Sequence, residues 1–324
     1  MEWIRTHLLR QCRKLTDMVP IAYVLAFAII TVGTLGWSAA IKAVPFLYSG
    51  EEEGLPGFEM MLWQYLGFTG IWVAMLFALA LPPANRRIFR DILPNGRGNS
   101  LMGILLGILG GFATNAICIL ISWLKHDIGL SLANFEALKL LMLYGAVFVQ
   151  SGAEEIICRQ YLYEKFRRRY QSPLAAIIFS AAFFGALHIF NPGITPLAMT
   201  QIVLVAIIFT LMVYYFDALW AAMFFHTTWN FTQNFFFGCP NSGIVSAYSL
   251  FKLDAAATGP FFDPVFGVEG SIGASAILAV LLVAMIVYAK TRGLEGQDLW
   301  ADLDAPRMAE QSAGTSGGGG KHFA

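Results

Sequence analysis

The sequence predicts an all-α fold, a polytopic transmembrane helical bundle of about eight spans. Of its 324 residues, 57% are hydrophobic and only 13% are charged, and the mean hydropathy is +0.62. A soluble domain of this length has too small a core to bury that much apolar surface. The apolar residues also occur in runs of about 18 or more, the length at which a helix crosses a bilayer.

Eight apolar segments carry this prediction. The first follows a basic stretch, is too long for the core of a signal peptide and shows no convincing cleavage site, so we expect it to be retained as a span. Strands are not expected, because a membrane-spanning barrel would show short segments of alternating polarity. The expected spans are residues 19–41, 60–82, 100–124, 136–162, 174–190, 196–216, 219–237 and 272–289.

The orientation follows from the Lys and Arg residues. Sixteen of them lie in the N-terminus, the second and fourth connections and the tail, against three in the alternate connections. Basic residues accumulate on the cytoplasmic side of a membrane, so both termini are predicted to be cytoplasmic in a plasma or inner membrane. An even number of spans agrees with this orientation.

The chain then divides into six parts. We expect residues 1–18 to be a cytoplasmic basic N-terminus and 19–134 the N-terminal transmembrane helices. The next expected parts are a catalytic transmembrane core over 135–237, an external loop over 238–271, a last transmembrane helix over 272–290 and a disordered cytoplasmic tail over 291–324.

Bulk charge and cysteines exclude some classes of function. The net charge is zero and no basic patch stands out, so no nucleic-acid partner is expected. The four cysteines fit neither a disulfide framework nor a zinc ribbon. Gly103, Gly107 and Gly111 recur every four residues in the third span, a stripe that predicts close helix packing rather than chemistry.

Ionisable residues inside a membrane helix are costly and usually mark function. Here they gather in three segments: the fourth span has Glu154, Glu155 and Arg159, the fifth ends with His188, and the seventh has His226, four residues before Asn230. Glu155 and Arg159 share a helix face and predict an ion pair. Glu154 is rotated by about 100° from Glu155 and faces elsewhere.

These side chains could hydrolyse a carbonyl compound with water. Glu154 is a candidate general base, His188 could hold or deprotonate the water, and His226 and Asn230 could donate hydrogen bonds to an oxyanion. Taken singly, the Glu155–Arg159 pair is explained as well by helix packing, and a lone histidine by an interhelical hydrogen bond. The set as a whole favours function.

The three segments resemble the motif set of the CPBP family, the CAAX proteases and bacteriocin-processing enzymes, also called the Abi family. The family pattern is Glu-Glu-x-x-x-Arg, Phe-x-x-x-His and His-x-x-x-Asn. The matching residues are Glu154, Glu155 and Arg159, then Phe184 and His188, then His226 and Asn230. The resemblance covers about residues 145–235.

This resemblance, which extends to type II CAAX prenyl endopeptidases, implies an intramembrane endopeptidase with a cavity open to the cytoplasm. It would cleave a membrane-associated, possibly prenylated, protein or peptide near the C-terminus. It implies Glu154 as general base, His188 binding the water with it, His226 and Asn230 stabilising the oxyanion, and Glu155 and Arg159 supporting the site. We favour a reaction without a cofactor, because Asn230 is a good donor and a poor zinc ligand, with zinc held by two histidines and a glutamate as the alternative.

His188 and Glu154 are expected to lie at different depths in the membrane if the spans end where they are predicted to end. His188 lies near the far end of the fifth span, whereas Glu154 lies roughly 15 Å inside the cytoplasmic end of the fourth. The two depths agree better if the fourth helix continues through Arg167–Arg169. Two other functions stay open: a proton- or ion-coupled transporter, and a catalytically silent immunity or scaffold protein of the same fold. The middle position of the ionisable residues argues against the first and the intact motif set against the second.

Overall fold

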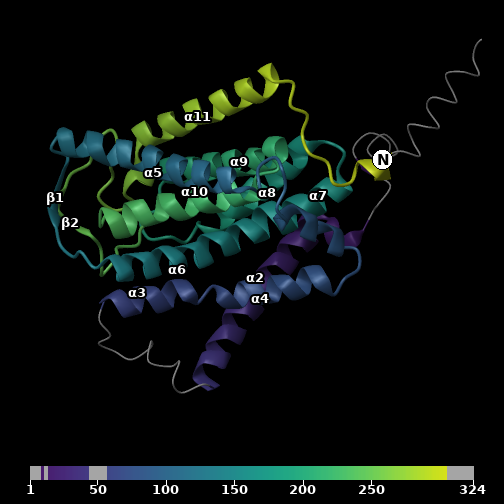
Figure 1. Ribbon diagram of the computed structural model, residues 1–324, viewed down its shortest axis with the longest axis horizontal. Coiled ribbons are helices and arrows are strands. Elements are labelled where there is room, and N and C mark those ends of the chain that lie inside the picture. Colours follow the sequence, from purple (N-terminus) through teal and green to yellow (C-terminus); the bar gives the residue numbers. More distant parts are fainter. Residues whose placement is uncertain (1–8, 11–13, 44–56, 305–324) are drawn as a thin grey trace, which may run out of the picture.

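The computed structural model describes residues 9–10, 14–43 and 57–304, and this part of the chain is a bundle of long helices (Figure 1). The main helices are α2 Val19–Ala43, α3 Gly57–Leu66, α4 Thr69–Ala80, α5 Leu101–Leu124, α6 Ala137–Glu155, α7 Tyr163–Arg169, α8 Pro173–Leu187, α9 Pro196–Phe216, α10 Leu219–Phe231 and α11 Ile272–Thr291. Short 3₁₀ helices are η1 Leu15–Asp17, η3 Arg86–Ile92, η6 Val268–Gly270 and η7 Ala301–Leu303.

All eight predicted spans are helical, which confirms the polytopic bundle. Six helical stretches are long and apolar enough to cross a membrane: 19–43, 57–80, 101–124, 137–169, 196–216 and 272–291. Two helices are shorter: α8 has 15 residues, and α10 has 13 before a π-helical turn, η5 Thr232–Phe236, lengthens it. Many large apolar side chains on the outer faces are exposed, as lipid contact requires.

Local sequence signals set several helix boundaries. The hydroxyls of Ser100, Thr195 and Ser271 each accept a hydrogen bond from a backbone N–H three residues on, at the first turns of α5, α9 and α11. Pro173 and Pro196 occupy the first positions of α8 and α9, where a missing N–H costs nothing. These signals explain why the predicted and observed starts of α5, α8, α9 and α11 agree to within one residue.

The glycine stripe packs α5 against α10, as predicted. A Cβ atom at Gly107 would clash with the carbonyl oxygen of Ala221, and one at Gly111 with that of Phe225. The two backbones therefore approach closely only because these positions are glycine. Since α10 carries His226 and Asn230, this contact also fixes the depth and rotation of two candidate site residues.

The expectation of no strands was wrong in one detail. Strands β1 Ile128–Leu132 and β2 Phe251–Ala256 pair antiparallel, with an irregularity between Gly129 and Leu130. They lie in the connections between helices, at the end of the bundle away from α7 (Figure 1). The sheet ties the long 238–271 connection to the α5–α6 connection, so this connection is anchored at its middle.

The fourth helical stretch continues beyond the predicted span, as the depth of Glu154 suggested. It runs without a break from Ala137 to Arg169. At its far end the buried guanidinium of Arg168 makes two 2.6 Å contacts with the carboxylate of Asp17 and also reaches Asn85. Basic residues, among them Arg167–Arg169, thus lie at this end of the bundle.

The predicted disordered tail is wrong for residues 292–304. The backbone N–H of Gln297 bonds to the carbonyl of Tyr214, Asp298 pairs with Arg10 and Arg167, and the indole of Trp300 donates to Glu164. These contacts hold the segment against the bundle, although its polar composition predicted disorder. Residues 1–8 and 305–324, the outer parts of the predicted N-terminus and tail, lie outside the described residues.

Candidate active site

The two glutamates of the fourth helical stretch lie where its geometry changes. α6 ends at Glu155, and Ile156–Leu162 (η4) forms a π-helix before α7 begins. A second π-helical turn, η5, begins two residues after Asn230. Such widened turns occur often at functional sites, because they redirect side chains within an otherwise regular helix. No residue pattern in the sequence predicted either turn.

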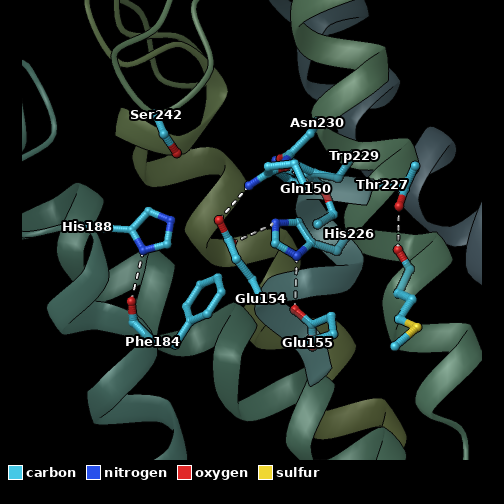
Figure 2. Close-up of polar contacts among 12 residues, drawn as sticks. Gln150, Glu154, Glu155, Phe184, His188, His226, Thr227, Trp229, Asn230 and Ser242 are labelled. Atoms are coloured by element: carbon cyan, nitrogen blue, oxygen red, sulfur yellow. Dashed lines mark hydrogen bonds and ion pairs between the residues drawn. The ribbon is translucent and has the colours of Figure 1, made fainter. Parts of the chain in front are cut away.

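Glu155 is fully buried and has two partners. Its Oε1 lies 3.1 Å from Nη1 of Arg159 and 2.9 Å from Nδ1 of His226. Arg159 is equally buried, and its guanidinium also lies over the rings of Phe184 and Phe209, at 4.3 and 5.4 Å. The predicted Glu155–Arg159 pair is therefore present, and it extends to His226 (Figure 2).

The contact with Glu155 determines which ring nitrogen of His226 carries a proton. A carboxylate only accepts hydrogen bonds, so Nδ1 of His226 is the protonated nitrogen. Nε2 of the same ring points to Glu154, whose Oε2 is 3.9 Å away. In the neutral ring Nε2 is an acceptor, and it becomes a donor only in the imidazolium form.

Glu154 differs from Glu155 in its surroundings. Its Oε1 accepts a hydrogen bond of 2.5 Å from Nε2 of Gln150. Its Oε2 is buried and has no hydrogen-bond partner among the described residues. One oxygen of Glu154 thus holds the side chain in place and leaves the other available to a bound molecule.

His188 lies directly after α8, at its C-cap. Its Nδ1 is 2.8 Å from the carbonyl oxygen of Phe184, so this nitrogen donates. Its Nε2 is then an acceptor in the neutral ring. In Figure 2 this second nitrogen points away from Phe184 and towards the side of Glu154 and Ser242.

Asn230 belongs to a polar network that sequence reasoning missed. Its Nδ2 lies 3.3 Å from Oγ of Ser151, and its Oδ1 accepts from Nδ2 of Asn241 at 3.3 Å. Asn241 in turn donates to Glu269, which also accepts from the backbone and hydroxyl of Ser242. Asn241, Ser242 and Glu269 come from the 238–271 connection, where no motif signals a role.

One cavity of about 320 Å³ brings most of these groups together. Four of the six predicted site residues line it directly, namely Glu154, His188, His226 and Asn230, whereas Glu155 and Arg159 lie buried behind them. The remaining wall is mixed, as in most small-molecule and peptide sites. Further lining residues are Gln64, Tyr65, Phe68, Gln150, Phe184, Asn191, Gln201, Phe209, Trp229, Asn241, Ser242, Ile244 and Glu269.

A zinc ion, the alternative cofactor for this site, would need three protein ligands grouped around it. Among the described residues, no three His, Cys, Asp or Glu side chains are grouped so that they could hold a metal ion. Glu154, His188 and His226 line the cavity, and the contacts of His226 with Glu155 and of His188 with Phe184 engage Nδ1 of each ring and leave Nε2 free. Contacts of this kind also orient histidines that bind metal ions, so zinc stays the alternative to the metal-free reaction.

Comparison with known proteins bears on the same region. Residues 136–232 match the family model of the type II CAAX prenyl endopeptidase Rce1-like proteins. Over 128 residues the chain is 30% identical to an uncharacterized protein, YyaK, of Bacillus subtilis (strain 168). This match spans 38% of the present chain and 40% of YyaK. No solved structure matches the chain. The matched residues include α6, α8 and α10, so the part of the chain that carries Glu154, His188, His226 and Asn230 is similar to the Rce1-like family of type II CAAX prenyl endopeptidases.

Proposed function

We propose that this protein is an intramembrane endopeptidase that uses water, rather than a serine or cysteine, as the nucleophile. One observation carries the proposal: the unpartnered Oε2 of Glu154 lies in a cavity that also exposes His188, His226 and Asn230, and hydrogen bonds to other residues hold each of these three. A base, an acceptor for water and preorganised donors are the parts that hydrolysis of an amide needs. The region similar to the Rce1-like family contains all four of these residues and supports a peptidase.

The water is bound between two acceptors. Oε2 of Glu154 takes one hydrogen of the water and Nε2 of His188 takes the other, since Nδ1 of His188 already donates to Phe184. The oxygen lone pair then points at the substrate carbonyl. On attack, the proton passes to Glu154, and a tetrahedral intermediate forms without any covalent link to the protein.

The negative oxygen of that intermediate needs donors on the opposite side. Nδ2 of Asn230 is one, because Asn241 occupies its Oδ1 and so orients the amide. Nε2 of His226 is the second, in the imidazolium form, with Nδ1 held by Glu155. Glu155 therefore positions His226, and the contact with Arg159 holds Glu155 in place. Glu154 then gives its proton to the departing amine as the C–N bond breaks.

The substrate is a membrane-associated protein or peptide that reaches a cavity within the bilayer. Comparative peptidomics tests this directly: membranes containing the wild-type protein are compared with membranes containing Glu154→Ala. Peptides that depend on Glu154 should appear as pairs sharing one cleavage position. Identical peptide profiles, with both proteins equally abundant, would refute peptidase activity.

A further inference from the structure

The cavity contains one buried donor to which the proposed reaction assigns no part. Among the described residues that line the cavity, two side chains have a buried polar atom without a hydrogen-bond partner, Oε2 of Glu154 and Nε2 of Gln201 on α9. The first belongs to the proposed base. The second is an amide nitrogen, which can only donate. Native proteins leave few buried polar groups unpaired, so this donor calls for a partner.

The other end of the Gln201 amide is held by a neighbouring helix. The side chain is 1% exposed, and its Oε1 lies 3.2 Å from Oγ of Ser275 on α11, which runs beside α9 (Figure 1). The same hydroxyl lies 3.0 Å from the carbonyl oxygen of Ser271, so these two acceptors share its one hydrogen. The amide is therefore oriented through its oxygen, and its nitrogen is left without a partner.

The cavity wall next to Gln201 is apolar. Ile202 and Val205 line the cavity from the same helix, and Leu278 lines it from α11. None of these side chains accepts a hydrogen bond, and the backbone carbonyls within both helices are already bonded to the following turn. The available partner for Nε2 of Gln201 is therefore an oxygen atom of a molecule bound in the cavity.

The position of Gln201 along α9 separates it from the reacting bond. Phe209 lies further along the same helix, and the centroid of its ring is 5.5 Å from that of His226. The rise of α9 from Gln201 to Phe209 is about 12 Å. An extended peptide advances about 3.3 Å per residue. Gln201 can therefore reach a carbonyl up to about four residues from the scissile bond, whereas the scissile carbonyl itself lies beside His226.

We propose that Gln201 is a substrate-binding residue whose Nε2 donates to a backbone carbonyl of an extended peptide, away from the scissile bond. The proposal rests on the proposed peptidase function. Every peptide carries backbone carbonyls, so the contact holds the chain without selecting a side chain. It is made equally in the bound substrate and in the transition state, so its loss should raise KM and leave kcat unchanged.

Binding of a peptide to an inactive variant tests this contact. The probe is a fluorescein-labelled decapeptide, chosen from a random library by its retention on immobilised Glu154→Gln protein in detergent. Adding Gln201→Leu, which keeps a similar shape without the donor, should raise the Kd about 3- to 10-fold, as expected for one hydrogen bond between uncharged groups. An unchanged Kd would overturn the proposal. If the wild-type protein does not cleave the same peptide, the peptidase function fails instead, and a library without any retained peptide would refute both.

Stability and kinetics separate a binding role from a structural one. With cleavage of that decapeptide as the readout, Gln201→Leu should raise KM by the same factor and keep kcat within about two-fold. Its melting temperature should not fall, because the hydroxyl of Ser275 keeps the carbonyl of Ser271 as acceptor and no donor is left unpaired. A clear fall in melting temperature, or a loss confined to kcat, would contradict the proposed role.

Gln160→Leu is the matched control for the loss of a buried glutamine. Gln160 is also 1% exposed, but its Nε2 donates to the carbonyl of Ile88 at 3.1 Å, and it does not line the cavity. Its replacement leaves that carbonyl without this donor, so the melting temperature should fall while the Kd for the decapeptide stays unchanged. Equal effects of the two leucine variants on the Kd would show that Gln201 acts only through the fold.

Replacing single amides of the decapeptide locates the bonded carbonyl. Each amide within about four residues of the cleaved bond is exchanged in turn for a trans-alkene, which keeps the shape but has no oxygen. One exchange should weaken binding to the Glu154→Gln protein about 3- to 10-fold and have little further effect once Gln201→Leu is present. Equal losses in the two proteins at every position would overturn the proposal.

Discussion

The Nδ1 atom of His226 lies 2.9 Å from Oε1 of Glu155, and both side chains are buried. The residues are 71 positions apart, on α10 and α6, so this contact joins two of the three motif-bearing helices. The same carboxylate oxygen is 3.1 Å from Arg159. Glu155 thus links a structural cation to a ring that faces the cavity, and changes at any of the three should affect both stability and activity.

Arg159→Leu should destabilise the protein strongly. Glu155 would be left buried with only its contact to His226 among the described residues, and breaking a buried pair in this way costs about 3–5 kcal/mol. Abundance in membranes and thermal stability in detergent should both fall. The double variant Glu155→Gln with Arg159→Leu should recover part of the stability but not the activity. An abundant and active Arg159→Leu protein would contradict the role of this pair.

Asn230→Ala should slow turnover with little effect on substrate binding. The change removes a donor to the oxyanion, a loss that typically lowers the rate about 10²–10³-fold. Steady-state kinetics in detergent should show kcat falling while KM stays within a few-fold. Asn241→Ala provides a graded comparison, because Asn241 orients the Asn230 amide and bonds to Glu269 but does not itself donate to the oxyanion, so its loss should cost less. A rise in KM with unchanged kcat would assign Asn230 to binding instead.

Gly111→Ala should loosen the contact between α5 and α10. The added methyl would meet the backbone of Phe225, and overpacking of this kind costs about 1–3 kcal/mol. Since α10 carries His226 and Asn230, activity should fall together with the melting temperature. Gly145→Ala is the matched control, because a Cβ there meets no atom within 4 Å. Equal effects of the two changes would rule out specific packing at Gly111.

Asp91→Asn should stabilise the protein at neutral pH. Burial, with Glu164 and Asp217 nearby, raises the pKa of Asp91 well above its ordinary 3.8. The folded state therefore binds this proton more tightly than the unfolded state. The free energy of unfolding thus falls as pH rises from the ordinary value through the raised pKa. Asparagine removes that loss.

Asp302→Asn is the control without pH dependence in the range measured. A hydrogen bond from Arg87 lowers the pKa of the exposed Asp302 from its ordinary 3.8, so its contribution is lost only below that value and should stay constant between about pH 4 and 8. Thermal melts in detergent between about pH 4 and 8 should show the Asp91→Asn protein gaining on the wild type as pH rises. A constant difference across that range would contradict the assigned pKa.

The bundle was predictable because runs of apolar residues, Lys/Arg asymmetry and capping residues are local signals. Ser100, Thr195 and Pro173 mark helix ends without help from the rest of the fold. The Glu155–Arg159 pair was predictable from its spacing of four, which survives the start of the π-helix. The packing role of the glycine stripe was likewise predictable from the four-residue spacing of its glycines.

The rest depends on contacts between distant parts of the chain. Glu269 and Asn241 lie in a connection with no periodic pattern, and their relation to Asn230 arises only because that connection folds back over the cavity. The partner of Nδ1 in His226 decides which nitrogen faces Glu154, and spacing alone does not reveal that partner. The ordered segment around Trp300 owes its place to Glu164 and Arg87.

The central claim is that Glu154 acts as a general base on water without a metal ion. The most direct measurement is turnover of a quenched peptide by the purified protein in detergent, with its metal content determined in the same preparation. Glu154→Gln keeps the shape of the side chain and its contact with Gln150, so it should stay folded while turnover is nearly abolished. The wild-type protein should keep full activity with strong chelators. Near-stoichiometric zinc, with activity lost on chelation and restored by added zinc, would contradict this account.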